Sequence, residues 1–411
     1  PTDICYHNVE GDLGIVYVKR SELSPITLSS LSYSFLPKCY GLMQMDEVTG
    51  GVQEFDTTSL IEAGILQSQG QPLELTGRRV TIGFIDTGIR YENEVFRTSG
   101  GQSRITAIWD QTIQSGEPPA GFEYGTEYTR EQIDEALASD NPLQIVPSTD
   151  TIGHGTAIAS VAAGSRLSGN RRFIGAAPDC NIVVVKLKPI KQYLREYYLI
   201  PEDVPCYQET DLIQAIQYLQ KFAVSLYSPL VICLGVGTNL GDHSGVSVFA
   251  RYLDLVMGRK SRAAVTCAGN EGNARLHYKG SVLNKEYEDV ELRVGEGTNG
   301  FTMELWGNSP DIISVAFISP SGEMISRIPA RVGQSDTVEF LLEKSKIDIS
   351  YSLVEAGGGV ELIFMRFIDP TPGVWIIRVY GNNILEGDYN IWLPIKQFID
   401  KETYFLKPNP D

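Results

Sequence analysis

Arg79-Val-Thr-Ile-Gly-Phe-Ile-Asp86-Thr-Gly-Ile89 is the stretch that decides the fold. Its apolar residues run together instead of alternating with polar ones, which is typical of a parallel strand covered on both faces. The acidic residue and Gly88 follow the run, so Asp86 is expected at the carboxyl end of the strand, where open α/β sheets place their functional groups. A carboxylate buried there needs a partner.

Strands and helices alternate along the chain on both sides of this stretch. Apolar runs predict strands, and amphipathic runs between them predict helices. The expected strands are 14–18, 104–110, 181–187, 229–235 and 263–270, and the expected helices are 59–66, 129–138, 156–163, 211–223 and 248–257. This order predicts an α/β fold with a doubly wound parallel sheet.

Composition excludes some classes of function. The chain has 411 residues, so more than one domain is expected. A net charge of −17 argues against nucleic acid as a partner, because phosphate binding needs clustered Lys and Arg. No apolar run reaches the ~18 residues that span a membrane. The six cysteines and the acidic residues lack the spacing of metal ligands, so we expect buried reduced thiols, no metal and no cofactor.

The sequence changes character at about residue 281. From there to about residue 396 it shows no convincing helix but eight short β-rich runs separated by turn signals. Three of the four tryptophans, Trp306, Trp375 and Trp392, fall in this region. Such a pattern predicts a β-sandwich or jelly roll, which we interpret as a separate, non-catalytic domain.

His154 is the first candidate partner for Asp86. It stands between Gly153 and Gly155 at the start of a helix of small residues. A lone histidine is commonly a capping or core residue, but the two glycines would let a substrate backbone approach closely. An acidic residue at a strand end and a histidine at a helix start suggest a carboxylate that orients a general base.

Asn270 ends a further predicted strand and allows two interpretations. It is either a turn residue or an amide that donates to a developing oxyanion.

Three motifs together resemble the subtilisin-like serine proteases. Ile85-Asp-Thr-Gly88, Asp150-x-x-Gly-His-Gly-Thr156 and Ala268-Gly-Asn270 are similar to that family's Asp, His and oxyanion-Asn motifs, in the family's order. The resemblance implies Asp86 and His154 as triad members and Asn270 as oxyanion donor. It also implies a substrate-binding strand and pocket, whose residues would be Leu234, Gly235, Val236, Gly237, Ala268 and Gly269.

A narrower resemblance is to the Csp-type clostridial germination proteases, which carry a jelly-roll insertion. It implies a propeptide remnant at 1–30, the first part of a catalytic domain at 31–280, the insertion at 281–396, and a return to the catalytic domain at 397–411 with the remainder missing. Residues 33–40 resemble the stretch near that family's propeptide junction. The family suggests a spore-associated or cytoplasmic protein, and no signal peptide is visible.

The sequence departs from the family at the nucleophile. Subtilases carry Gly-Thr-Ser-x-Ala, whereas none of the four Gly-Thr pairs here is followed by Ser. One hypothesis is an active endopeptidase whose serine lies on a separate C-terminal fragment. The other expected partners of such an endopeptidase are its own propeptide and a protein or peptide substrate. The alternative is a catalytically inactive pseudoprotease that binds or regulates another protein.

A third interpretation comes from Asp86-Thr-Gly88, which also occurs in aspartic proteases. Those enzymes need two such carboxylates sharing one proton. The chain has only one Asp-Thr-Gly, and its α/β alternation does not suit that class.

Overall fold

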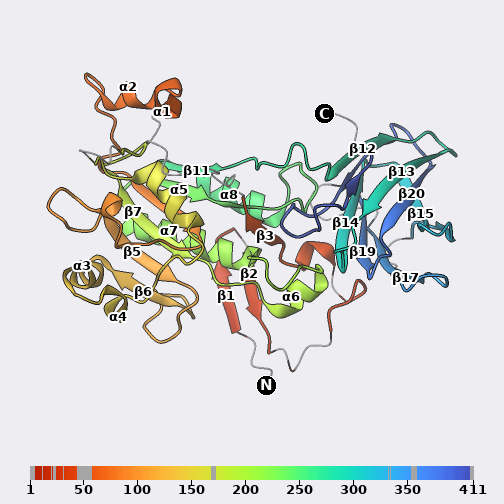
Figure 1. Ribbon diagram of the computed structural model, residues 1–411, viewed down its shortest axis with the longest axis horizontal. Coiled ribbons are helices and arrows are strands. Elements are labelled where there is room, and N and C mark those ends of the chain that lie inside the picture. Colours follow the sequence, from red (N-terminus) through yellow and green to blue (C-terminus); the bar gives the residue numbers. More distant parts are fainter. Residues whose placement is uncertain are drawn as a thin grey trace.

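The computed structural model describes residues 5–11, 13–19, 21, 25–30, 32–43, 58–167, 173–331, 333, 335–352 and 359–407. These residues form an α/β half and a β half, which lie side by side along the longest axis of the molecule (Figure 1).

A six-stranded sheet forms the centre of the α/β half. Its strands lie in the order β11 (Arg262–Thr266), β9 (Leu230–Leu234), β4 (Thr81–Asp86), β7 (Asn181–Lys186), β5 (Ile105–Asp110) and β6 (Thr126–Thr129). The first five are parallel and β6 is antiparallel to β5. All six residues of β4 are buried, as its continuous apolar run predicts. The predicted parallel sheet is confirmed.

Helices cover both faces of this sheet. On one face, α3 (Arg130–Ala138) and α5 (His154–Ala163) pack against a cluster that includes Phe84 of β4. On the other, α7 (Glu209–Ser225) and α8 (Val248–Met257) pack against a cluster that includes Ile85. Consecutive residues of β4 therefore face opposite layers. Helix α3 follows its N-cap, Thr129, which forms a capping box with Gln132.

The β half consists of two antiparallel sheets around one apolar core. One sheet has the order β12 (His277–Ser281), β21 (Asp388–Trp392), β14 (Gly300–Gly307), β19 (Glu361–Ile368), β18 (Lys346–Ser352) and β17 (Ser335–Glu339). The other has the order β16 (Met324–Ile328), β15 (Ile312–Ile318), β20 (Gly373–Asn382), β13 (Tyr287–Val294) and β22 (Tyr404–Phe405). The eight predicted strands are all present, and the described residues between 281 and 396 contain no helix. The jelly-roll connectivity stays a prediction.

Shorter elements complete the described chain. They are the hairpin of β1 (Cys5–Val9) and β2 (Leu13–Tyr17), the 3-10 helices η2 (Tyr33–Phe35) and η3 (Glu94–Phe96), and the helices α1 (Thr58–Glu62), α2 (Ile65–Gln69), α4 (Pro142–Ile145) and α6 (Gln192–Tyr197). No helix in the described part of the chain is long and apolar enough to cross a bilayer.

Three sequence expectations are corrected. The helix expected at 59–66 is broken at Gly64, whose φ of 70° is left-handed. The strand expected at 263–270 ends at Thr266, so the residues that follow form a loop. Cys267 is exposed rather than buried, because it lies in that loop beyond the strand. The six cysteines are free, as expected.

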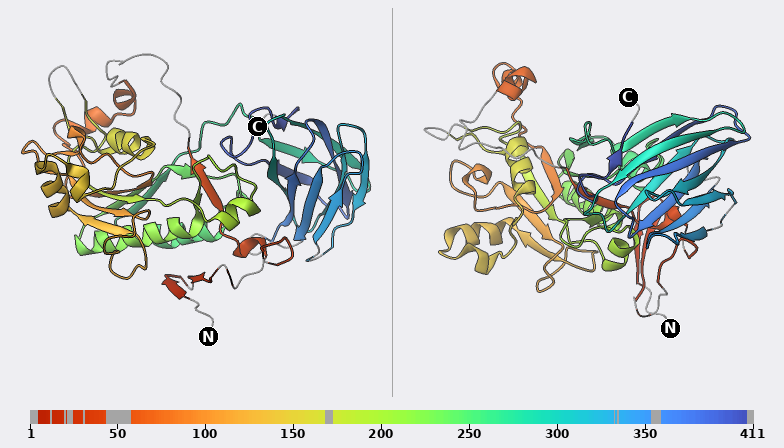
Figure 2. Two further views of the ribbon diagram at one scale, coloured as in Figure 1. Left: turned by 60° about the horizontal axis from the view of Figure 1, so that its bottom comes forward. Right: turned by 45° about the vertical axis from the view of Figure 1, so that its right-hand side comes forward.

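An N-terminal strand runs between the two halves. β3 (Cys39–Leu42) lies between β10 (Val236–Gly237) and β8 (Tyr207–Gln208) in a three-stranded antiparallel sheet. Figure 2 shows it, in red, between the α/β half and the β half. An apolar cluster that includes Leu36 and Cys39 from this region, and Trp306 and Phe364 from the β half, joins the two halves here.

Candidate active site

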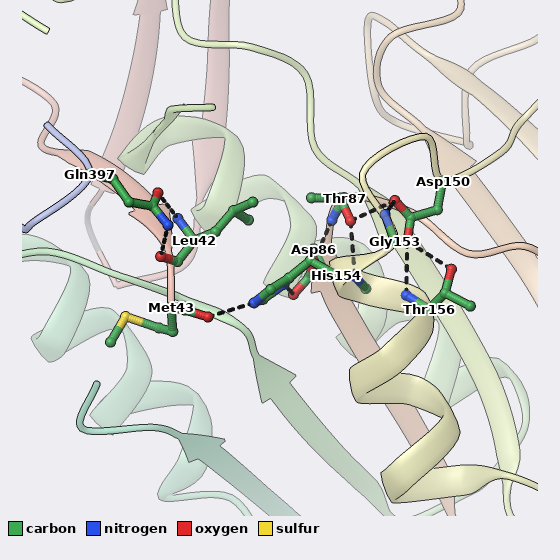
Figure 3. Close-up of polar contacts among 10 residues, drawn as sticks. Leu42, Met43, Asp86, Thr87, Asp150, Gly153, His154, Thr156 and Gln397 are labelled. Carbon is green, nitrogen blue, oxygen red and sulfur yellow. Dashed lines mark hydrogen bonds and ion pairs between the residues drawn. The ribbon is translucent and has the colours of Figure 1, made fainter. Parts of the chain in front are cut away.

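Asp86 and His154 are in direct contact. Asp86 is the last residue of β4 and His154 is the first of α5, and both side chains are buried. Nδ1 of the histidine lies 2.8 and 3.0 Å from the two carboxylate oxygens (Figure 3). The backbone N–H of Thr87 donates to the same carboxylate over 2.7 Å. A strand end and a helix start, 68 residues apart in the chain, therefore form one polar pair.

The other ring nitrogen of His154 contacts a backbone carbonyl. Nε2 lies 2.8 Å from the carbonyl oxygen of Met43. A carboxylate and a carbonyl only accept hydrogen bonds, so this arrangement favours the imidazolium form of His154, in which both ring nitrogens are donors. Burial alone would lower the pKa of His154, but the hydrogen bond and charge of Asp86, with the bond to Met43, raise it above its usual value.

Asp150 fixes the strand end to the helix start. Its carboxylate accepts hydrogen bonds from the hydroxyl of Thr87, the backbone N–H of Gly153, and both the N–H and the hydroxyl of Thr156, over 2.7–2.9 Å. Burial alone would raise the pKa of Asp150, but these donors hold it below its usual value. Asp150 stands at the start of the motif that contains His154, and its neighbours in the sequence do not indicate this role.

We expect Asp150→Ala to lower the free energy of unfolding by about 3 kcal/mol, because it leaves several buried donors without an acceptor. The measurement is urea unfolding, with Asp140→Ala, a change of the same kind at an exposed position, as the control. Because its pKa is depressed, Asp150 contributes stability above about pH 4, and this contribution is lost as pH falls through the folded-state pKa. If the difference in unfolding free energy between Asp150→Ala and the wild type stayed constant at low pH, this role would be contradicted.

Residues 39–43, which we call the cleft segment, lie in the cleft as an extended strand. Leu42 and Gly41 pair with Val236 and Gly237 of β10, and the N–H of Met43 donates to the carbonyl of Gly235 over 3.2 Å. On the opposite side the first two residues of β3 pair with β8. The segment thus adds a strand between two strands of the α/β half, as a bound peptide does.

The side chain of Met43 lies against Gly237 and Gly269 in a cleft that Ala268 also lines, and we call this place the Met43 pocket. A Cβ atom at Gly237 would overlap its sulfur, and one at Gly269 would overlap its terminal methyl group. The pocket therefore exists because two glycines lack side chains. These are residues that the resemblance assigned to substrate binding, and the structure places them beside Leu234, Gly235 and Val236.

Gly235 lies directly behind the Asp86 carboxylate. A Cβ atom there would overlap Oδ2 of Asp86 and lie 2.8 Å from Ile158. We expect Gly235→Ala to displace the carboxylate and lower kcat about 10²-fold, the size of effect of a misplacement of about 1 Å. Gly100→Ala, which adds a methyl group in ordinary contact at a remote loop, is the control for steady-state kinetics on the full-length protein. Unchanged kcat in Gly235→Ala would contradict this packing argument.

Asn270 lies in the loop that follows β11. It is exposed there and lines a smaller neighbouring cavity with Lys396 and Tyr404, whereas Ala268 and Gly269 line the cleft that holds Met43. Its role as an oxyanion donor stays a prediction. Within the described ranges, no group of three or more His, Cys, Asp or Glu side chains is placed to hold a metal ion.

The fold and this site define a class of protein. A buried Asp–His pair at a strand end and a helix start of a parallel sheet, facing a bound peptide strand, is the arrangement of a subtilisin-like domain. Residues 77–328, more than half of the chain, match the Subtilase family, and the chain belongs to this family.

Two relatives support this assignment. The structure of the CspB protease of Clostridium perfringens superposes with a TM-score of 0.74 at 27% identity, over 86% of this chain and 69% of that one. The Subtilisin-like protease SBT3.6 of Arabidopsis thaliana is 26% identical over 327 residues, 73% of this chain. The chain spans 40% of the length of that plant protein.

Proposed function

We propose that the chain carries the acidic and basic members of the catalytic triad of a serine endopeptidase that hydrolyses peptide bonds in protein substrates. One observation carries the proposal. The carbonyl oxygen of Met43, in the extended segment that lies in the cleft, is 2.8 Å from Nε2 of His154, whose Nδ1 contacts Asp86. A peptide carbonyl thus lies beside an imidazole oriented by a carboxylate, and these are groups that a serine protease brings together around its nucleophile.

The proposed chemistry follows from this geometry. A serine hydroxyl beside Nε2 gives its proton to His154 while its oxygen bonds to the carbonyl carbon. The C–N bond then breaks, and His154 returns the proton to the leaving amine, which leaves the acyl group on the serine as an ester. A water molecule then gives a proton to His154 while its oxygen bonds to the same carbon, and the C–O bond to the serine breaks as His154 returns the proton to the serine oxygen, which releases the carboxylic acid. Asp86 keeps Nδ1 protonated and stabilises the imidazolium. Asn270 is the proposed oxyanion donor, a role in which a single donor is worth about 10²–10³ in rate.

The serine is proposed to come from a C-terminal fragment outside these 411 residues, because the sequence holds no Gly-Thr-Ser. The exposure of β11 supports this source. Its residues Ala263, Ala264, Val265 and Thr266 are exposed, and Val265 is 56% exposed. A strand of a parallel sheet is ordinarily covered on both faces. A fragment that packs on β11 would bury these residues next to the cleft.

The first substrate is proposed to be the N-terminal segment of the same chain. The cleft segment pairs with β10, fills the Met43 pocket and ends against His154, so the bond after Met43 is the proposed cleavage site. The propeptide predicted at 1–30 would then extend through Met43. The domain boundaries at 31–280, 281–396 and 397–411, and the germination role implied by the resemblance, stay predictions.

Labelling by a fluorophosphonate tests the proposal. The probe reacts with an activated serine, so we expect the full-length protein to be labelled and His154→Ala to stay unlabelled, as read by intact mass spectrometry. Met43→Asp, whose segment fills the Met43 pocket poorly, controls for a cleft blocked by residues 39–43. If neither the wild type nor Met43→Asp is labelled, the alternative function, a pseudoprotease that binds without cleaving, replaces this one.

A further inference from the structure

The chain that leaves the β half forms an additional wall of the cleft. Residues 393–399 follow β21, and Ile395 and Phe398 within them are buried. Both belong to the apolar cluster that contains Leu36 and Cys39 from the N-terminal region. The wall therefore packs on the side of the cleft segment opposite β10.

One side chain of this wall binds the backbone of the cleft segment. Nε2 of Gln397 donates to the carbonyl oxygen of Leu42 over 2.7 Å, and the N–H of Leu42 donates to Oε1 of Gln397 over 3.2 Å (Figure 3). In an antiparallel pair, successive residues direct their N–H and C=O groups to opposite sides. The N–H of Met43 faces Gly235, so the backbone groups of Leu42 face away from β10. Gln397 satisfies both of them, as a neighbouring strand would.

The same wall leaves no room for a side chain at Gly41. A Cβ atom there would overlap Cδ1 of Ile395 and would lie 3.0 Å from Phe398 and 3.1 Å from Oε1 of Gln397. Gly41 has no left-handed φ, so its backbone does not itself require glycine. Packing against Ile395, with Phe398 and Gln397 close by, is what disfavours a larger residue at this position.

We propose that Gln397 and Ile395 are substrate-binding residues that set the specificity of the cleft. This inference rests on the proposed function. Gln397 binds the backbone of the residue just before the one whose carbonyl is attacked. Ile395 favours glycine at the preceding substrate position, which Gly41 occupies in the cleft segment. The substrate class is thus a peptide with Gly, then a residue with a free backbone N–H, then a residue such as Met that fills the Met43 pocket.

Peptide hydrolysis by the full-length protein tests the glycine requirement. We expect kcat/KM for a Tyr-Gly-Leu-Met peptide to exceed that for Tyr-Ala-Leu-Met by about 10–100-fold, the usual cost of one misfitting methyl group. Ile395→Val removes Cδ1, the overlapping atom, and little else. It should reduce this ratio, because it removes the closest overlap and leaves only the tighter contacts to Phe398 and Gln397. Equal rates on both peptides in the wild type would overturn the role of Ile395.

A peptide with N-methyl-leucine in place of Leu tests Gln397, because it has no N–H for Oε1. We expect this change to lower kcat/KM about 10-fold in the wild type, as for one lost hydrogen bond with a partner left unsatisfied. The penalty should vanish in Gln397→Ala. Gln144→Ala, the same change at an exposed position in α4, should keep it. A penalty of the same size in Gln397→Ala would overturn the proposal.

Amide hydrogen exchange separates this inference from the proposed function, because it needs no catalysis. In protein that retains the cleft segment, Gln397→Ala should speed exchange of the Leu42 amide about 10-fold or more, as expected when one hydrogen bond is lost. Gln144→Ala should leave it unchanged. Unchanged exchange in Gln397→Ala would overturn the inference even in an active enzyme. A protein that hydrolyses nothing, but shows the faster exchange, would refute the proposed function and leave the contact established.

Discussion

Replacing His154 with alanine in the full-length protein is expected to lower kcat about 10⁶-fold, the loss that removal of the equivalent base causes in subtilisin. The reason is geometric. Nε2 lies 2.8 Å from the Met43 carbonyl, next to the carbon that the proposed nucleophile attacks, and Asp86 holds the other ring nitrogen. The measurement is single-turnover hydrolysis of the Tyr-Gly-Leu-Met peptide.

Two controls make this result specific. Circular dichroism should show that His154→Ala keeps the wild-type secondary structure, because α5 retains its other hydrogen bonds to Asp150. A residual rate above the uncatalysed reaction is expected from substrate binding alone. If His154→Ala keeps activity within about 10-fold of the wild type, the assignment of the general base is wrong, since a base contributes at least about 10²-fold.

Asp86→Asn is expected to lower kcat about 10⁴-fold, the size of effect when an amide replaces a triad carboxylate and favours the wrong imidazole tautomer. The amide occupies the same space, so the packing against Gly235 is retained. Steady-state kinetics measures the loss of kcat. The control is Asp140→Ala, which removes a carboxylate at an exposed position.

The pH dependence of kcat/KM also tests the contact between Asp86 and His154. The base must be neutral to act, so kcat/KM of the wild type should rise with pH through the raised pKa of His154, above the ordinary value of about 6.5. In Asp86→Asn the midpoint should move to lower pH, because the carboxylate that favours the charged ring is gone. A midpoint that stays in place would show that Asp86 does not act on His154.

The same pKa shift affects how the cleft segment is held. His154 has a raised folded-state pKa, so its stabilising contacts are fully present below the unfolded value of about 6.5 and are lost as pH rises through the folded value. The hydrogen bond from Nε2 to the Met43 carbonyl is one of these contacts. Low pH therefore favours binding of the cleft segment to His154, whereas high pH favours the neutral form of His154 that can act as a base.

Local patterns in the sequence were enough to predict much of the fold. The unbroken apolar run of β4 predicted a strand buried on both faces with Asp86 at its end, and glycine-flanked His154 predicted a helix start near a substrate. The change to short β-rich runs predicted the two antiparallel sheets. Each of these signals lies within a few consecutive residues, where periodicity and turn residues act.

Other features of the site carry no local signal. The sequence of β3 does not reveal that it lies against His154, because that depends on pairing with β10 almost 200 residues later. Gln397 is a glutamine in a loop, and only the fold brings it to Leu42. The role of Asp150 was missed for another reason, since a buried acceptor of four hydrogen bonds looks in sequence like any turn aspartate.

Mass spectrometry of the purified full-length protein tests the central claim most directly. If Asp86 and His154 catalyse hydrolysis of the bond held in the cleft, the wild type should show an N-terminal fragment that ends at Met43 and a new amino terminus at residue 44. His154→Ala should remain uncut at that bond. A wild type that is intact at this position, or a His154→Ala variant cleaved there to the same extent, would contradict the claim.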